Sequence, residues 1–277
     1  MTRSAFDPVS TIDGKHHRVT LGLRALDPAA WLQFDADFCD DVRLKRELLR
    51  SRPSDVLAVT DDAADATREL LAHVVDHLAC FHPHQPREPE VGVPELQAAA
   101  LLVQEDLCLL TKGDEGWVLS AACVCFPSRW RLTDKMGASV AAIHAPVPGY
   151  DAISDPVDSF LDRLSVDRPM WRTNWTLLDN ADRYQPDRPA TRVKNPGDWT
   201  FRVERQTLSR LPVTGAVVFT IRTYRCTLNE LVAHSDGAAA DLAAMLTSVG
   251  PDHLEYRAWS DLPHIIAWLH AHSASGS

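Results

Sequence analysis

The stretch TFRVERQTLSRLPVTGAVVFTIRTYRCTL, residues 200–228, decides the fold class. Two runs rich in β-branched and aromatic residues flank the turn PVTG at 212–215, and this pattern predicts a β-hairpin. A second hairpin is predicted upstream, where LLVQEDLCLLTK (101–112) and WVLSAACVCF (117–126) flank the polar turn GDEG. One further strand at 171–179, WRTNWTLLD, brings the total to about five. Together these segments predict an antiparallel sheet.

Helices are predicted before the strands. In residues 26–51 the apolar side chains recur at helical spacing, with Asp27 as the cap and Pro28 at the first helical position. Residues 61–81 carry a second apolar stripe of the same period. The polar, proline-rich segment 82–95 then predicts a loop.

Helices are also predicted between and after the hairpins. PVDSFLDRL at 156–164 is a short candidate with Asp155 as its cap, and residues 237–249 and 262–273 are two more. Helices, then strands, then helices is an α+β order. We expect one domain over residues 1–277, divided into a mainly helical part at 1–100, a sheet core at 101–228 and C-terminal helices at 229–277.

Composition limits the classes of function. Hydrophobic content of 45% and charged content of 24% are ordinary for a soluble globular protein, and no window is apolar enough to span a bilayer. The N-terminus lacks the apolar run of a secretion signal, so we expect a cytoplasmic protein. A formal net charge of -10 argues against a nucleic-acid or anionic-membrane partner, because both require a basic surface.

The sequence contains no signature of a metal-binding cluster. The six cysteines form no CxxC pair, which argues against a zinc site or an iron–sulfur cluster. His73 and His77 are four residues apart on a predicted helix, but no third ligand accompanies them. We therefore interpret them as surface or packing histidines.

His144 is the first candidate for chemistry. It stands alone in the apolar, proline-bounded segment IHAPVPGY, residues 143–150, in which Pro146 and Pro148 stiffen the backbone. A single neutral imidazole in such a setting suits an axial haem ligand. The alternative is a buried structural histidine beside a solvated basic turn.

A basic group surrounds this segment. Haem propionates are bound well by arginine, because its planar fork meets a carboxylate in bidentate fashion. Arg129 and Arg131 share one face if the WRL segment is a strand. The alternative for each is an exposed sheet face. The candidate cofactor-binding residues are His144, which is also the metal ligand, Arg129, Arg131, Lys135 and Arg172.

Four segments in one order resemble a known family. They are CFPSRWRLTDKMG (125–137), IHAPVPGY (143–150), RPMWRTNW (168–175) and FRVERQTLSRLPVTGAVVFTIRTY (201–224). Together they resemble the haem subunit of the haem-dependent oxidative N-demethylases, or dimethylamine monooxygenases. The resemblance extends from residue 21 to residue 224 and is strongest from residue 103 onward.

The resemblance has implications for fold and activity. It implies a PAS-like antiparallel sheet that carries haem b, with the N-terminal and C-terminal helices packed around it. It implies His144 as the iron ligand and the oxidation of a small alkylamine to the demethylated amine and formaldehyde. Thr173 is a departure, since relatives are expected to carry a basic residue there, and the change bears on substrate or partner preference.

A small methylated cation requires aromatic faces and a carboxylate or amide. Within the strand VERQTL, Glu204 and Gln206 share one face and Arg205 and Thr207 the other, and either pair is a candidate pocket lining. The alternatives are an ion pair of Glu204 with a neighbouring arginine and core packing of the tryptophans. The candidate catalytic residues are Glu204, Gln206 and Tyr150, and the candidate substrate-binding residues are Trp171, Asn174 and Trp175.

Electrons for oxygen activation must come from another protein if this interpretation holds. The sequence contains no GxGxxG turn, no flavin signature and no cluster cysteines, which implies flavin- and iron–sulfur-containing reductase subunits as electron donors. The main alternative is a haem-PAS sensor, although no attached output domain is evident. A weaker alternative is a small-ligand-binding protein without haem. Hydrolytic motifs such as GxSxG and HExxH are absent from the sequence.

Overall fold

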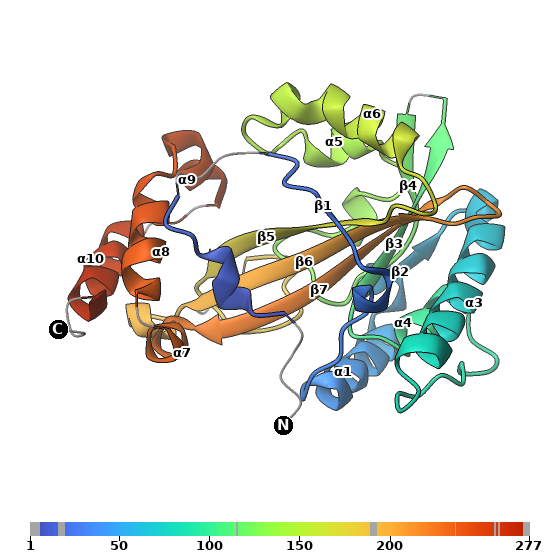
Figure 1. Ribbon diagram of the computed structural model, residues 1–277, viewed down its shortest axis with the longest axis horizontal. Helices are drawn as coiled ribbons and strands as arrows, with labels where there is room; N and C mark the ends of the chain where they lie inside the picture. Colours follow the sequence, from blue (N-terminus) through green and yellow to red (C-terminus); the bar gives the residue numbers. More distant parts are fainter. Residues whose placement is uncertain are drawn as a thin grey trace.

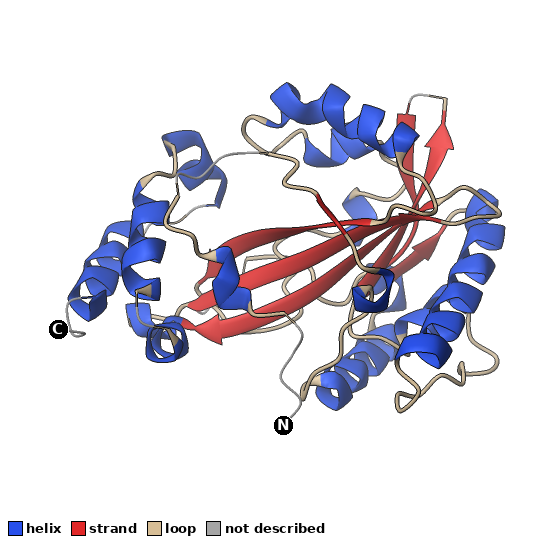
Figure 2. Ribbon diagram, viewed as in Figure 1, coloured by secondary structure: helices blue, strands red, loops and turns tan. Residues whose placement is uncertain are grey.

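The computed structural model describes residues 6–15, 20–114, 116–188, 193–235, 237–257, 259 and 261–273. Within these residues, seven antiparallel strands form one sheet in the order β1-β5-β6-β7-β3-β4-β2. Figure 2 shows this sheet with helices at both of its ends. The strands are β1 (Arg24–Ala25), β2 (Leu57–Val59), β3 (Asp106–Gly113), β4 (Gly116–Cys123), β5 (Met170–Leu178), β6 (Thr200–Arg210) and β7 (Val217–Thr227).

The predicted hairpins are confirmed. β6 pairs with β7 from Thr200↔Thr227 to Arg210↔Val217, and β3 pairs with β4 around the GDEG turn. β5 adds to the outer side of β6. β1 and β2 were not predicted, because strands of two or three residues are too short to show an alternation of apolar and polar side chains. The α+β class is confirmed, whereas the PAS-like designation and the single-domain division stay predictions.

The helices precede, interrupt and follow the strands. Their bounds are α1 (Phe38–Ser51), α2 (Pro53–Val56), α3 (Ala64–Phe81), α4 (Glu95–Ala100), α5 (Val140–His144), α6 (Ser154–Arg163), α7 (Leu228–His234), α8 (Ala238–Thr247), α9 (Pro251–Arg257) and α10 (Leu262–Ser273). Short 3-10 helices include η2 (Pro28–Ala30), η4 (Leu132–Asp134) and η5 (Tyr150–Ile153). No helix in the described residues is long and apolar enough to cross a bilayer.

Three sequence predictions need correction. The long helix expected over 26–51 is divided, because Asp27 and Pro28 begin only the 3-10 turn η2 and α1 starts at Phe38. Asp155 lies inside the first turn of α6 rather than at its cap. The WRL segment is not a strand, since β4 ends at Cys123 and Arg129 adopts a φ of 61°.

One face of the sheet, the core face, packs against both groups of terminal helices. Leu107, Leu109 and Val218 contribute to the cluster formed with α1, α3 and α4. Phe201 and Val203 contribute to a second cluster, formed with α7, α8 and α10. Figure 1 shows α1, α3 and α4 near one end of the sheet and α8 to α10 near the other.

The opposite face, the insertion face, is covered by apolar residues at one end only. Leu161 of α6 and Val140 of α5 pack there with Leu208 and Val217 of the sheet. α5 and α6 belong to the insertion between β4 and β5, which lies above the sheet in Figure 1. The apolar cover ends at the row Met170, Leu208 and Phe219, and the next rows along β5 and β6 are polar, although Ile221 of β7 is apolar.

Candidate functional site

A polar strip occupies the uncovered part of the insertion face. In antiparallel strands, directly opposed residues project to the same face. The register aligns Arg172 with Gln206, Asn174 with Glu204 and Thr223, and Thr176 with Arg202 and Arg225. We define the polar strip by its members Arg172, Asn174, Thr176, Arg202, Glu204, Gln206 and Thr223.

Glu204 is held at the centre of the polar strip. Its Oε1 accepts from Nη2 of Arg202 at 3.0 Å, and its Oε2 accepts from Nε2 of Gln206 at 3.0 Å. Arg202 is only 1% exposed and also donates to the carbonyl of Phe126 at 2.6 Å and to Oγ1 of Thr223 at 3.1 Å. The ion pair considered for Glu204 therefore exists with Arg202, and it fixes the carboxylate on the strip rather than removing it from the site.

Arg172 is the unpaired cation of the polar strip. No hydrogen bond or ion pair of its side chain occurs within the described part of the chain, and its Nε is buried without a partner. Burial lowers the pKa of Arg172, and the nearby charge of Glu204 only partly opposes this effect. Arg172 is half-buried, and a guanidinium whose Nε is buried without a hydrogen bond is costly, so the arrangement favours an anionic group at this point.

His144 ends α5 and approaches the polar strip from the insertion. Its Nδ1 lies 2.8 Å from the carbonyl oxygen of Val140. A carbonyl only accepts hydrogen bonds, so Nδ1 carries the hydrogen and the neutral ring keeps its lone pair on Nε2. This is the arrangement by which proteins orient a histidine that binds a metal.

The surroundings of His144 keep its ring neutral. The ring stacks on Tyr150, with centroids 4.8 Å apart and an interplanar angle of 14°. The residue as a whole is solvent-exposed, but this packing desolvates the ring and lowers the pKa of His144. The charges of Lys135 and Arg172 lower it further, so both cations lie close enough to act on the imidazole.

Lys135 and Tyr150 support the histidine segment. Nζ of Lys135 donates to the carbonyl of Ile143 at 2.8 Å, at the C-terminal end of α5 where a cation is favourable. Tyr150 is 6% exposed, and burial raises the pKa of its hydroxyl to about 12. The hydroxyl therefore stays protonated at neutral pH. Lys135 acts on the segment that carries His144, beside the strip rather than in it.

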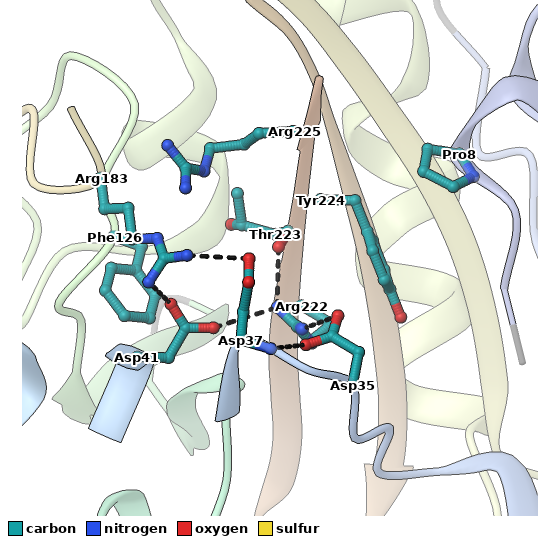
Figure 3. A pocket seen from close by; sticks show the side chains of 10 residues that line it. All are labelled: Pro8, Asp35, Asp37, Asp41, Phe126, Arg183, Arg222, Thr223, Tyr224 and Arg225. Carbon is teal, nitrogen blue, oxygen red and sulfur yellow. Dashed lines mark hydrogen bonds and ion pairs between the residues drawn. The ribbon is translucent and has the colours of Figure 1, made fainter. Parts of the chain in front are cut away.

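A cavity of about 90 Å³ lies beside the outer half of β7 and meets the polar strip at Thr223. Figure 3 shows that Arg183 and Arg222 pair with the three aspartates of the lining, whereas Arg225 donates to the backbone carbonyl of Ala181. Arg183 pairs with Asp37 at 2.8 Å and also with Asp41, and Arg222 pairs with Asp35. The cavity is largely neutralised by these pairs, whereas the polar strip leaves Arg172 unpaired. We therefore place the candidate site at the strip.

Residues 22–266 match the protein family described as haem-dependent oxidative N-demethylase, alpha subunit-like. The chain belongs to this family. The family resemblance stated from the sequence is thereby confirmed, and the description carries both a haem dependence and an alpha-subunit-like place in a larger assembly.

The residues of this N-demethylase family member fit a haem group. Imidazole is a common haem ligand, and the free Nε2 lone pair of His144 can supply it. Haem also carries two carboxylates, which suit a guanidinium such as the unpaired Arg172. The charges of Arg172 and Lys135 act on the ring of His144, and the roles of all three residues toward haem stay proposals.

Arg129 and Arg131 are not part of this group. Arg129 pairs with the buried carboxylate of Asp179. Arg131 forms a two-pronged ion pair with Asp187 on the surface, with Nε to Oδ1 at 2.9 Å. Each guanidinium is already bound to a carboxylate of the chain itself, because the segment is an irregular turn instead of a strand. The role of both residues toward haem carboxylates stays a prediction, and these ion pairs weigh against it.

The predicted substrate-binding residues separate onto two faces. Asn174 lies on the polar strip opposite Glu204. Trp171 and Trp175 project to the core face, where Trp171 meets Phe6 edge-on at 6.1 Å. Core packing, the alternative considered for the tryptophans, is what the structure contains, so they do not line the strip.

Of the two pairs considered on β6, Glu204 and Gln206 lie on the polar strip, and their role in lining a pocket stays a prediction. Thr207 is fully buried and lies 2.6 Å from the hydroxyl of Thr220. Arg205 is 3% exposed and donates to the backbone carbonyls of the η2 turn and of the residue after it. Arg205 and Thr207 therefore belong to the core face.

One charged residue near the polar strip escaped prediction. Arg257 ends α9 and donates from Nη1 to the carbonyl of Trp175 on β5 at 2.8 Å. Gly250 followed by Pro251 was a readable helix start. Nothing in the local sequence pattern indicates that this helix packs beside β5, which lies some eighty residues earlier in the chain.

Proposed function

We propose that this chain is the haem-carrying subunit of an amine monooxygenase. It would oxidatively demethylate a small secondary amine such as dimethylamine, giving the primary amine and formaldehyde. One observation carries the proposal: the free Nε2 lone pair of His144 lies near the unpaired guanidinium of Arg172. The haem dependence in the family description supports it.

In this proposal Nε2 of His144 would bind the iron of haem b, and Arg172 would bind one of its propionates. The hydrogen bond from Nδ1 to Val140 fixes the ring plane, and the stacked Tyr150 limits its rotation. The bound haem supplies the activation of molecular oxygen, which no amino-acid side chain provides.

Glu204 is the proposed partner of the amine. A secondary amine is an ammonium ion at neutral pH, and the N–H groups of that ion would donate to Oε2 of Glu204. Arg202 and Gln206 prevent this carboxylate from turning away, and the Asn174 amide lies opposite it on β5. Glu204 can accept the ammonium proton, which leaves the amine neutral for oxidation of the methyl group.

The overall reaction needs external electrons. Dimethylamine, oxygen, two electrons and two protons give methylamine, formaldehyde and water, with hydroxylation of one methyl and breakdown of the carbinolamine. We propose flavin- and iron–sulfur-containing reductase subunits as the electron source. The alpha-subunit-like description supports a multi-subunit assembly. In the described residues no group of histidine, cysteine and carboxylate side chains is arranged to hold a metal ion.

The first test compares visible spectra of the protein expressed with added haem. We expect a Soret band that weakens or shifts in His144→Ala, and partial recovery of the band in His144→Gly with added imidazole. His272→Ala is a matched control, because His272 makes the same Nδ1 contact to a carbonyl four residues earlier, at 2.8 Å, and stacks on Trp268. A parent protein that takes up no haem would exclude this function.

The second test separates an enzyme from a haem sensor. Haem-loaded protein, a reductase and dimethylamine should release formaldehyde in proportion to the oxygen consumed. Haem uptake with oxygen binding, but without amine-dependent formaldehyde under any reductase, would favour the haem-PAS sensor instead.

A further inference from the structure

A buried carboxylate lies on the same face of the sheet as the polar strip. Asp106 begins β3, where it is opposed to Ile221 of β7, and Ile221 is opposed to Gln206 of the strip. Directly opposed residues of antiparallel strands project to one face, so Asp106 lies in the same row as Gln206 on the insertion face. It is only 1% exposed, and the proposed reaction does not use it.

Two consecutive backbone amides bind this carboxylate. Oδ1 of Asp106 accepts from the amide of Cys125, and Oδ2 accepts from the amide of Phe126, both at 2.9 Å. Both residues lie beyond the end of β4 at Cys123. The carboxylate therefore fixes the backbone at the point where the strand has ended.

Phe126 connects Asp106 to the polar strip. Its carbonyl accepts from Nη2 of Arg202 at 2.6 Å, and the same nitrogen donates to Oε1 of Glu204 at 3.0 Å. Pro127 follows, and a proline restricts the preceding residue toward extended conformations. A series of hydrogen bonds thus leads from Asp106 through Phe126 to the ion pair of the strip.

Arg202 depends on the Phe126 carbonyl for its position. Its other acceptors are Oε1 of Glu204 and Oγ1 of Thr223, at 3.0 and 3.1 Å, so the carbonyl at 2.6 Å is the nearest of the three. Nη1 is buried and makes no hydrogen bond among the described residues. A guanidinium that is 1% exposed cannot turn to water for a lost acceptor, so a displaced Phe126 should displace Arg202 and the carboxylate bound to it.

We propose that Asp106 is a positioning residue of the candidate site: through Phe126 it holds Arg202, and thereby Glu204, in the orientation that binds the amine. This inference rests on the proposed function and deepens it, because it states what orients the carboxylate that receives the substrate. Asp106 itself is too deeply buried to meet the amine.

The side chain must be ionised to accept from both amides, because protonation turns one of its oxygens into a donor. Burial raises the pKa of Asp106 to about 6, although the charge of Lys45 and the two amide hydrogen bonds oppose that effect. The carboxylate is therefore ionised at pH 8 and largely protonated at pH 5. The other ionisable groups beside it are Lys45, Glu105, Cys108, Cys125 and Arg202.

The first measurement follows the Nε–H proton of Arg202 by NMR, since this group donates to Oε1 of Glu204 at 3.3 Å. In Asp106→Asn it should exchange with solvent about tenfold faster than in the parent. Glu69→Gln is the matched control, because Glu69 also accepts from two consecutive amides, those of Val213 and Thr214, but at the hairpin turn. Equal protection of Arg202 in the parent and in Asp106→Asn would overturn the inference.

A pH titration of the parent requires no variant and decides the question if Asp106→Asn does not fold. The amides of Cys125 and Phe126 and the Nε–H of Arg202 should shift together, with a midpoint near pH 6. Glu105→Gln should leave these shifts in place, because Glu105 is bound to the amide of Gln33 instead. Amide shifts without a shift at Arg202 would contradict the proposed connection.

Activity separates this inference from the proposed function. In the haem-loaded protein, Asp106→Asn should lower kcat/KM for dimethylamine about tenfold and leave the Soret band unchanged, whereas Glu69→Gln should change neither. Faster exchange at Arg202 with an unchanged kcat/KM would also overturn the positioning role. A parent that takes up no haem would end the proposed function, while the NMR measurements, which need neither haem nor amine, would still decide whether Asp106 holds Arg202.

Discussion

His144 and Tyr150 stack face to face, with ring centroids 4.8 Å apart and planes 14° from parallel. Consecutive turn bonds, from the amide of Val147 to the carbonyl of His144 and from that of Tyr150 to the carbonyl of Val147, bring the rings together. The residues between them form the proline-bounded segment that made His144 a candidate haem ligand in the sequence. Its prolines shape the turn, and the tyrosine at its end supplies the ring that packs on the imidazole.

Replacing Tyr150 with alanine should expose the His144 ring. Desolvation is the main cause of the lowered pKa of His144, so that pKa should rise toward its ordinary value. Loss of a buried aromatic side chain should also cost about 3 kcal/mol of unfolding free energy. NMR titration of His144 and urea unfolding measure the two effects. Tyr150→Phe keeps the stacked ring and should resemble the parent; an equal pKa change in both variants would contradict a packing role.

His77 should make stability depend on pH. Its ring is buried against Trp31 and Phe81, and burial lowers the pKa of His77 from 6.5 to about 4. The unfolded chain binds a proton at higher pH than the folded chain, so stability is full above about pH 6.5 and falls as the pH drops toward 4. Between pH 7 and pH 5 the loss should be about 2 kcal/mol.

The His77→Phe variant isolates this contribution. Phenylalanine preserves the aromatic contacts but does not titrate, so the difference in unfolding free energy between parent and variant should shrink or reverse from pH 7 to pH 5. Denaturant unfolding at the two pH values supplies the measurement, and titrations of groups that do not interact with His77 cancel in the comparison. A pH-independent difference would mean that the ring is solvated in the native state.

Elements with repeated patterns could be predicted from the sequence, and isolated contacts could not. β6 and β7 alternate over eleven residues each, and α3 carries a long apolar stripe, so their types and faces were readable. The alternation in VERQTL also predicted that one of two pairs, Glu204 with Gln206 or Arg205 with Thr207, faces away from the core. Only the tertiary packing shows that Arg205 and Thr207 belong to the core face.

The ion-pair partners were beyond the sequence pattern. Arg131 looked equivalent to Arg172, but Asp187 lies fifty-six residues away in the chain and still reaches it. Arg257 likewise meets Trp175 across eighty-two residues. Such pairs depend on where loops and helices return to the sheet, and neither periodicity nor residue spacing contains that information.

Glu204→Gln should separate substrate binding from haem binding. Glutamine keeps an acceptor oxygen toward Arg202 but removes the negative charge at the centre of the polar strip. We expect the haem spectrum to remain near that of the parent, while kcat/KM for the amine falls by tenfold or more, about the effect of losing one charged hydrogen bond. Gln206→Leu is the companion variant: it frees one oxygen of Glu204 but keeps the charge, so a smaller loss is expected. Equal kcat/KM in Glu204→Gln and the parent would remove Glu204 from the site.

Arg129 and Arg131 should differ in stability but not in haem uptake. Arg131 and Asp187 are more than half exposed, and solvent screening limits such a pair to under about 1 kcal/mol, so Arg131→Ala should unfold much like the parent. Arg129→Ala removes a guanidinium that pairs with the buried carboxylate of Asp179, so it should lower the free energy of unfolding more than Arg131→Ala does. Urea unfolding measures the stability difference, and Soret titration measures the haem affinity. Both variants, once folded, should bind haem as tightly as the parent, because these guanidinium groups are committed to carboxylates of the chain. A large loss of haem affinity in Arg131→Ala would restore that arginine to the cofactor site and argue that its pair with Asp187 opens when haem binds.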